Sequence, residues 1–333
     1  MSQTKKELVQ AALNNQPVDR VPVGFWFHYL ADESHADAFV DPNLAKQNIA
    51  GHRAFYERFN PDFIKLMSDG YFIYPNEGLQ KVTSVEDLRD VRPLGPNHPW
   101  IEKQVELVKN LQDIFGHEVL TFYNIFAPAR YLEWSLPSYG KNIIGDFIAE
   151  DKEAFKAALA VVAKDVATLS ERIIKDGGAD GIYFSVQNID DRRITNTIYK
   201  DVIEPGEQTV LAAANKVSDN NILHICGYEG HHNDLGWYTD YKAKAYNWAG
   251  KVENISLEAG KKIFPGKAVI GGFGNGKDDV LYSGTEKSIG EETAKILQNA
   301  GRTGVILGAD CTVPGTIDLK HLEWVRQAAR SQS

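Results

Sequence analysis

Short apolar segments alternate with longer amphipathic segments along most of the chain. Eight apolar segments have the length and the β-branched and aromatic content of strands, and they span residues 21–27, 63–67, 119–123, 181–186, 221–225, 245–248, 268–273 and 304–308. Helical segments are expected between them, with examples at residues 102–115, 152–176, 206–218 and 290–300. A first helix is expected from Thr4 to about Asn14, because Thr4 and Glu7 form a capping-box pattern.

Strands that alternate with helices are typical of a parallel sheet with helical crossovers. Eight such units predict an α/β fold, a single (β/α)8 TIM barrel that covers residues 1–333 as one domain, with an N-terminal helix and an insertion between strands 2 and 3. An open doubly wound sheet is the alternative. Such a sheet usually has a glycine-rich phosphate turn after its first strand, and Gly24-Phe25-Trp26 offers none.

The charge of the chain limits its partners. The 333 residues include 36 lysines and arginines against 45 aspartates and glutamates, for a net charge of -9. An acidic chain without a cluster of cations binds a phosphate backbone poorly, so we expect no nucleic acid partner. No segment approaches the roughly 18 apolar residues that span a bilayer, and residues 1–15 contain no apolar signal core. The expectation is a cytoplasmic protein without a membrane partner.

The two cysteines are too few for a disulfide scaffold, but both follow predicted strands. Active sites of (β/α)8 barrels lie at the carboxyl ends of the strands, where Cys226 follows the fifth strand and Cys311 the eighth. His224 is two residues before Cys226, so on a strand the two side chains point to the same side. A histidine and two thiolates suit zinc and leave its fourth position open, which implies catalysis. We therefore expect one zinc per chain at His224, Cys226 and Cys311.

Simpler interpretations exist for these residues. A free cysteine usually packs in the core, and a lone histidine at a strand end is more often hydrogen-bonded than metal-bound. Asp69 ends the second predicted strand and is a candidate for acid–base catalysis, with a helix cap as the alternative. Polar residues at the other strand ends are candidate substrate contacts, namely His28, Asn124, Gln187 and Asn247.

Three motifs are similar to those of a known family. Pro17-Val18-Asp19-Arg20-Val21-Pro22-Val23 is similar to its N-terminal signature, Met67-Ser68-Asp69 to its Phe-Ser-Asp motif and Phe126-Ala127-Pro128 to its Gly-Ala-Pro segment. On these motifs the chain resembles the uroporphyrinogen decarboxylase superfamily over nearly its full length. The resemblance implies a (β/α)8 barrel and makes Asp69 the central catalytic carboxylate.

The decarboxylase branch of that superfamily binds a porphyrinogen without a metal. It uses an Arg-Gln-Ala-Gly-Arg-Tyr-Leu motif near the first strand and a late Gly-His-Gly motif. This chain has Phe25-Trp26-Phe27-His28 before Tyr29-Leu30, so both arginines are missing, and Gly308-Ala309-Asp310-Cys311 replaces the late histidine motif. The loss of both arginines disfavours a polycarboxylate tetrapyrrole substrate.

The other branch comprises zinc methyltransferases that move a methyl group between a corrinoid and a thiol, such as methylcobamide:coenzyme M methyltransferase. Their ligands are a His-x-Cys pair and a distant cysteine near the last strand, and His224, Cys226 and Cys311 look like that set. Some members add a glutamate after the sixth strand, which residues 246–249 lack, so water, substrate or Asp310 is the candidate fourth ligand. The resemblance also suggests a corrinoid protein as a partner and a homodimer.

The expected function is therefore the activation of a small-molecule thiol for methyl transfer from a corrinoid or another methyl donor. Three alternatives remain open at this point. They are decarboxylation of a porphyrinogen through Asp69, a non-catalytic subunit that binds zinc or a corrinoid, and a metal-free enzyme whose cysteines are structural.

Overall fold

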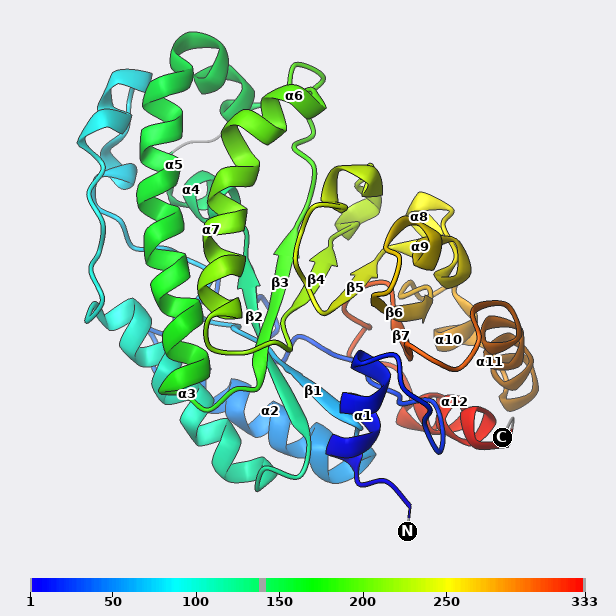
Figure 1. Ribbon diagram of the computed structural model, residues 1–333. Helices are drawn as coiled ribbons and strands as arrows, with labels where there is room; N and C mark the ends of the chain where they lie inside the picture. Colours follow the sequence, from blue (N-terminus) through cyan, green and yellow to red (C-terminus); the bar gives the residue numbers. More distant parts are fainter. Residues whose placement is uncertain (1, 138–141, 332–333) are drawn as a thin grey trace.

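The computed structural model describes residues 2–137 and 142–331. It shows an α/β fold in which parallel strands form one curled sheet, with neighbours in chain order from β1 to β7 (Figure 1). The strands are β1 (Phe63–Leu66), β2 (Leu120–Phe126), β3 (Gly181–Val186), β4 (Ile222–Ile225), β5 (Ala245–Trp248), β6 (Ala268–Phe273) and β7 (Val305–Ala309).

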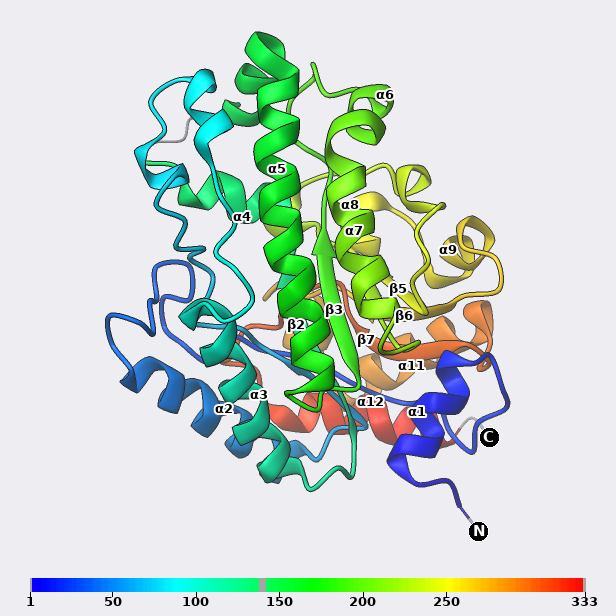
Figure 2. The ribbon, with the colours of Figure 1, turned by 60° about the vertical axis from the view of Figure 1, so that its left-hand side comes forward.

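Helices surround the sheet, most of them on its outer face (Figures 1 and 2). They are α1 (Lys5–Leu13), α2 (Asn43–Phe59), α3 (Pro99–Phe115), α4 (Pro128–Ser135), α5 (Ile143–Lys175), α6 (Asn196–Ile198), α7 (Glu204–Asn215), α8 (Gly250–Glu253), α9 (Leu257–Ile263), α10 (Val280–Ser283), α11 (Glu286–Ala300) and α12 (Leu319–Ser331). The longer ones contact one another in series from α7 through α5, α3, α2, α12 and α11 to α9. None of the helices in the described ranges is long and apolar enough to cross a membrane.

Seven of the predicted strands are confirmed, while the segment at residues 21–27 forms only an isolated parallel bridge between Val23 and Leu307. The amide of Gly24 donates to the carbonyl of Leu307 (2.9 Å), and the amide of Leu307 donates to the carbonyl of Pro22 (2.9 Å). Proline has no amide proton to extend this ladder. The segment therefore lies beside β7 without becoming a strand.

The first helix begins as predicted, with Thr4 and Glu7 forming a capping box. Its apolar residues Val9 and Leu13 pack with the interior side chains of the sheet, so α1 closes the amino-terminal end. Between β1 and β2 the chain passes through two short 3-10 helices, Leu79–Lys81 and Val85–Asp90, before α3.

Side-chain parity determines which residues reach the interior of the curled sheet. Phe63, Phe122, Ile222 and Ala245 belong to one buried interior cluster. Because strand side chains alternate between faces, the residue two positions after each of them also points inward. This places Lys65, Asn124, His224 and Asn247 inside, above the apolar amino-terminal layer.

A buried ion pair attaches the bridging segment to β1. The Asp62 carboxylate receives two hydrogen bonds from the Arg20 guanidinium, both 2.6 Å, and one from the amide of Val23 (2.8 Å). The Asp62 side chain is only 1% exposed. Removal of one partner of such a pair leaves a charge buried without compensation.

We predict that Asp62→Ala lowers the free energy of unfolding by about 3–5 kcal/mol, because Arg20 and the Val23 amide lose their acceptor. Urea unfolding followed by circular dichroism measures this. Glu77→Ala is the control, since Glu77 is 85% exposed in its pair with Lys81 and should change stability by less than about 1 kcal/mol. Equal effects of the two substitutions would contradict a stabilising role for the ion pair.

A second buried carboxyl group lies on α7. Glu207 accepts hydrogen bonds from the hydroxyls of Tyr199 (2.8 Å) and Tyr241. Its other oxygen is buried without a partner among the described residues. Burial raises the pKa of Glu207 from its ordinary value of 4.5 to about 8. The folded chain therefore holds this group in its protonated form at neutral pH.

This raised pKa predicts a pH-dependent stability. Between pH 4.5 and about 8 the folded state retains a proton that the unfolded state has lost, so the contribution of Glu207 falls as the pH rises. We expect the difference in unfolding free energy between Glu207→Gln and wild type to grow by on the order of 3 kcal/mol across this range, in favour of the variant. Urea unfolding at pH 5 and pH 8 tests this, with the exposed Glu291→Gln as control. A pH-independent difference would disprove the assignment.

Candidate functional site

His224 is oriented by a residue on the neighbouring strand. β4 and β5 pair His224 with Asn247, and Nδ1 of His224 is hydrogen-bonded to Oδ1 of Asn247. The Nδ2 group of Asn247 donates to the carbonyls of Ile270 (2.9 Å) and Ala309 (3.2 Å). These two carbonyls fix the orientation of the amide, so its oxygen must accept the proton of Nδ1. The lone pair of His224 Nε2 is thereby left free to bind a metal.

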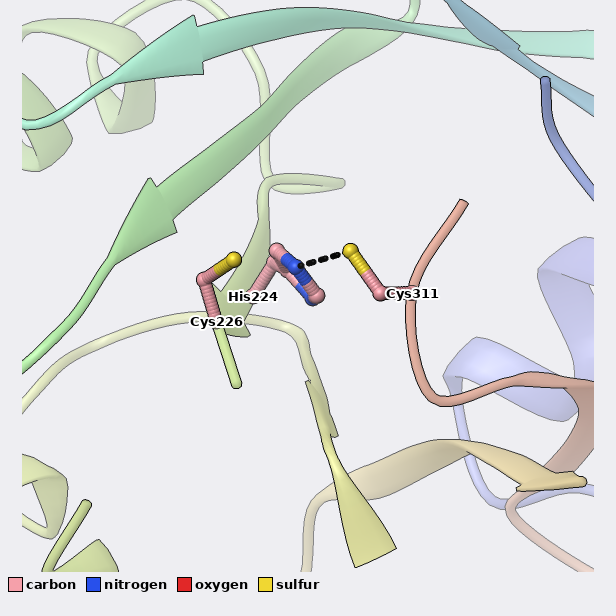
Figure 3. Close-up of side chains that lie close together, drawn as sticks. All are labelled: His224, Cys226 and Cys311. Carbon is pink, nitrogen blue, oxygen red and sulfur yellow. Dashed lines mark hydrogen bonds between the residues drawn. The ribbon is translucent and has the colours of Figure 1, made fainter. Parts of the chain in front are cut away.

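Both cysteines bring their sulfur atoms to this nitrogen (Figure 3). Cys226 follows β4 and Cys311 follows β7, and the three donor atoms lie within 4.8 Å of one another. Sγ of Cys311 is 3.6 Å from Nε2 of His224. Ordinary zinc–ligand bond lengths give a tetrahedral S···N edge of about 3.6 Å. The chemistry of the donors and their spacing therefore fit zinc.

The two thiols titrate as a pair. A hydrogen bond from Cys226 lowers the pKa of Cys311, and His224 and Lys65 act in the same direction. The same hydrogen bond, together with burial, raises the pKa of Cys226. The thiolate is the form of cysteine that binds metals.

The loop after β4 is held by two further polar residues. Nδ2 of Asn233 donates to the carbonyl of Cys226 (2.9 Å). The backbone amide of Asn233 donates to Oε1 of Glu253 (2.7 Å), and this carboxylate is 4% exposed. The position of Cys226 thus depends on α8, which carries Glu253.

Asp69 and His28 form a second polar group at the same end of the sheet. The fully buried Asp69 carboxylate accepts hydrogen bonds from the backbone amide of Tyr29 (2.7 Å) and from Nδ1 of His28 (2.9 Å). Nε2 of His28 lies 3.5 Å from Oγ1 of Thr312, the residue after Cys311. This contact connects the carboxylate to the loop that carries one of the sulfur donors.

The remaining candidate residues take different positions. Asn124 is buried and donates to the hydroxyl of Ser68 (3.1 Å), next to Asp69. Gln187 is half-buried directly after β3. The Asp310 carboxylate accepts from the amide of Lys251 (2.9 Å), and burial raises its pKa to about 7. It is not part of the donor group found in the described ranges.

Asn247, a candidate substrate contact on the sequence, is fully buried and lies beside His224 on the neighbouring strand. The site also contains three residues that the sequence did not indicate, Thr312, Asn233 and Glu253. Their roles depend on loop geometry, for which the sequence contains no signal.

A family model described as uroporphyrinogen decarboxylase (URO-D) matches residues 4–332. A search of curated protein sequences found no significant match.

Solved structures share the fold at low sequence identity. A methyltransferase from Methanosarcina mazei is 16% identical with a TM-score of 0.72, and the match covers 99% of each chain. A putative vitamin-B12 independent methionine synthase from Listeria monocytogenes is 13% identical with a TM-score of 0.57, covering 95% of this chain and 98% of that one. A B12-independent methionine synthase from Shewanella sp. W3-18-1, in complex with selenomethionine, is 11% identical with a TM-score of 0.58, covering 94% and 97%. At these identities the likeness establishes the fold.

We predict that Asn247→Ala weakens zinc binding by roughly 10- to 100-fold, because His224 loses the group that fixes its tautomer and ring orientation. Competition with a chelator of known affinity measures the dissociation constant, and circular dichroism checks that the variant is folded. Asn110→Ala, at an exposed position of α3, is the matched control. Unchanged zinc affinity in Asn247→Ala would show that Asn247 does not position this ligand.

Proposed function

The chain belongs to the uroporphyrinogen decarboxylase (URO-D) family, and from that premise we propose that it is a zinc-dependent methyltransferase. It would activate a thiol for methyl transfer from a corrinoid or another methyl donor. The observation that carries the proposal is the convergence of His224, Cys226 and Cys311 with the lone pair of His224 Nε2 left free. The similar structures described as a methyltransferase and methionine synthases support it.

Zinc at this centre would bind a substrate thiol at its open position and lower the thiol pKa, so that a thiolate is present at neutral pH. The two cysteines contribute negative charge that balances a divalent cation. Asn247 holds His224 in the tautomer that can coordinate. The two cysteines, His224 and Asn247 would therefore hold the metal-binding arrangement in place before the substrate enters.

The second polar group, formed by Asp69 and His28, would supply a fixed negative charge at the same end of the sheet. Asp69 is held by the Tyr29 amide and by His28. In this position its carboxylate would orient the methyl donor or stabilise positive charge that develops on it. His28, which is 23% exposed, together with Asn124 and Gln187, is proposed to contact the substrate.

Decarboxylation of a porphyrinogen is the second candidate, because the family model and the buried Asp69 favour it. The side chains that precede Tyr29 argue against it. Phe25, Trp26 and Phe27 are each at most 5% exposed, and they contribute no cation for the carboxylates of such a substrate.

We predict one zinc per chain in the purified protein, and nearly complete loss of zinc in Cys226→Ser, Cys311→Ser and His224→Ala. Elemental analysis measures the metal content. His35→Ala is the control, since the His35 side chain is 83% exposed and should leave the zinc content unchanged. Transfer of the methyl group from methylcobalamin to 2-mercaptoethanol, followed by the visible absorption of the cobalamin, should fall in parallel with the zinc content.

Two results would contradict this proposal. Full zinc content and activity in Cys226→Ser would exclude a cysteine-bound catalytic metal. Decarboxylation of uroporphyrinogen by wild type and Cys311→Ser alike, without thiol methylation by either, would favour the decarboxylase.

A further inference from the structure

Lys65 is a lysine in the interior of the curled sheet. It is the third residue of β1 and is only 4% exposed. Its Nζ lies 4.5 Å from the centre of the Tyr183 ring and 5.4 Å from the Trp26 ring. Among the described residues, no oxygen is found to form an ion pair or hydrogen bond with this Nζ atom. Lysine is almost never buried to this extent unless its charge is compensated.

The compensating charges belong to the candidate metal centre and to Asp69. Burial lowers the pKa of Lys65, while Cys311, Cys226 and Asp69 act in the opposite direction. Asp69 already interacts with the Tyr29 amide and with His28. When no metal is bound, the two sulfurs are the other groups that favour the ammonium form; a divalent cation bound between them would neutralise this charge.

The aromatic ring of Tyr183 connects Lys65 to this centre. The Lys65 ammonium lies 4.5 Å from the centre of the Tyr183 ring, and the centre of the His224 ring lies 5.8 Å from it. The Tyr183 ring thus lies next to both the cation and a candidate ligand, and electrostatic interactions are strong where water is excluded. The ammonium charge therefore acts on the centre through space, beside a ring that also lies next to His224.

The net charge of the metal-loaded centre indicates what Lys65 could do. A divalent cation with two thiolates and a neutral imidazole carries no net charge. A bound substrate thiolate would make the group anionic, which is costly in a buried site. One ammonium group nearby cancels that charge.

We propose that Lys65 is a positioning residue whose buried ammonium lets the His224–Cys226–Cys311 centre accept a third anionic sulfur, so that the open position selects a thiolate over a neutral ligand. This inference rests on the proposed function. When a thiol binds, its proton passes to the buffer, its sulfur forms the new bond to the metal, and Lys65 keeps its own proton.

The test uses the full-length chain loaded with Co²⁺, because the visible absorption of Co²⁺ reports the number of sulfur ligands. Wild type and Lys65→Met are titrated at pH 7 with 2-mercaptoethanol and, separately, with imidazole as a neutral ligand. We expect Lys65→Met to bind 2-mercaptoethanol about ten-fold or more weakly, the size of effect that a nearby opposite charge produces. Its affinity for imidazole should be unchanged. Lys164→Met, at an exposed position of α5, is the matched control.

A thermal melt separates this role from a structural one. Replacement of a buried charge by an apolar side chain of similar length often preserves or raises stability, so Lys65→Met should melt at or above the wild-type temperature. Lys65→Gln provides a second neutral variant with the same expected loss of thiolate selectivity. Equal thiol affinity in wild type and either folded variant would overturn the inference, as would an equal loss of affinity for imidazole.

The failure of the proposed function has a different signature. If wild type binds no Co²⁺ through its cysteines, or binds Co²⁺ but no thiol, the proposed function fails and this inference fails with it. If wild type binds both and the neutral variants match it, the inference alone is wrong.

Discussion

The exclusion of water from charged groups inside the curled sheet is the constraint on which the whole site depends. The amino-terminal half of the interior is filled by apolar side chains and closed by α1, so polar groups above it have few partners to choose from. Each buried charge there has its own partners: Asp69 has a backbone amide and His28, and Lys65 has the rings of Trp26 and Tyr183. In such a network, removal of one member leaves another uncompensated.

The same constraint explains how a common framework can support a different chemistry. Asp69 occupies the position that the family resemblance assigns to its central carboxylate. Residues 25–27, where a polycarboxylate substrate would need cations, are instead buried aromatic side chains. Trp26 lies beside Lys65, with its ring 5.4 Å from Nζ. Under the proposed function, an interior arranged in this way would hold an anionic sulfur better than a substrate with several carboxylates.

The parts that could be predicted from sequence were those governed by local pattern. The seven strands follow from their apolar runs, the start of α1 follows from its capping box, and the shared side of His224 and Cys226 follows from strand parity. The role of Asn247 could not be predicted, because it depends on the register between β4 and β5. Lys65, in the apolar segment at residues 63–67, could have been recognised from the sequence as unusual, since a charge in a buried strand requires a partner. Its partners could not be predicted, because Trp26 and Tyr183 are distant in sequence.

The segment at residues 21–28 shows why closure of the sheet and assembly of the site cannot be separated. Its backbone forms one bridge to β7 and accepts single hydrogen bonds from the amides of Asp62 (3.2 Å) and Val313 (3.0 Å), and side chains at its two ends add to these few contacts. At one end, the amide of Val23 and the side chain of Arg20 bind Asp62. At the other, His28 joins Asp69 to Thr312. Because the residue next to Thr312 is Cys311, a shift of this segment would move a sulfur donor and the partner of the Asp69 carboxylate together. The polar contacts that compensate for the missing strand ladder are thus the same contacts that align the two functional groups.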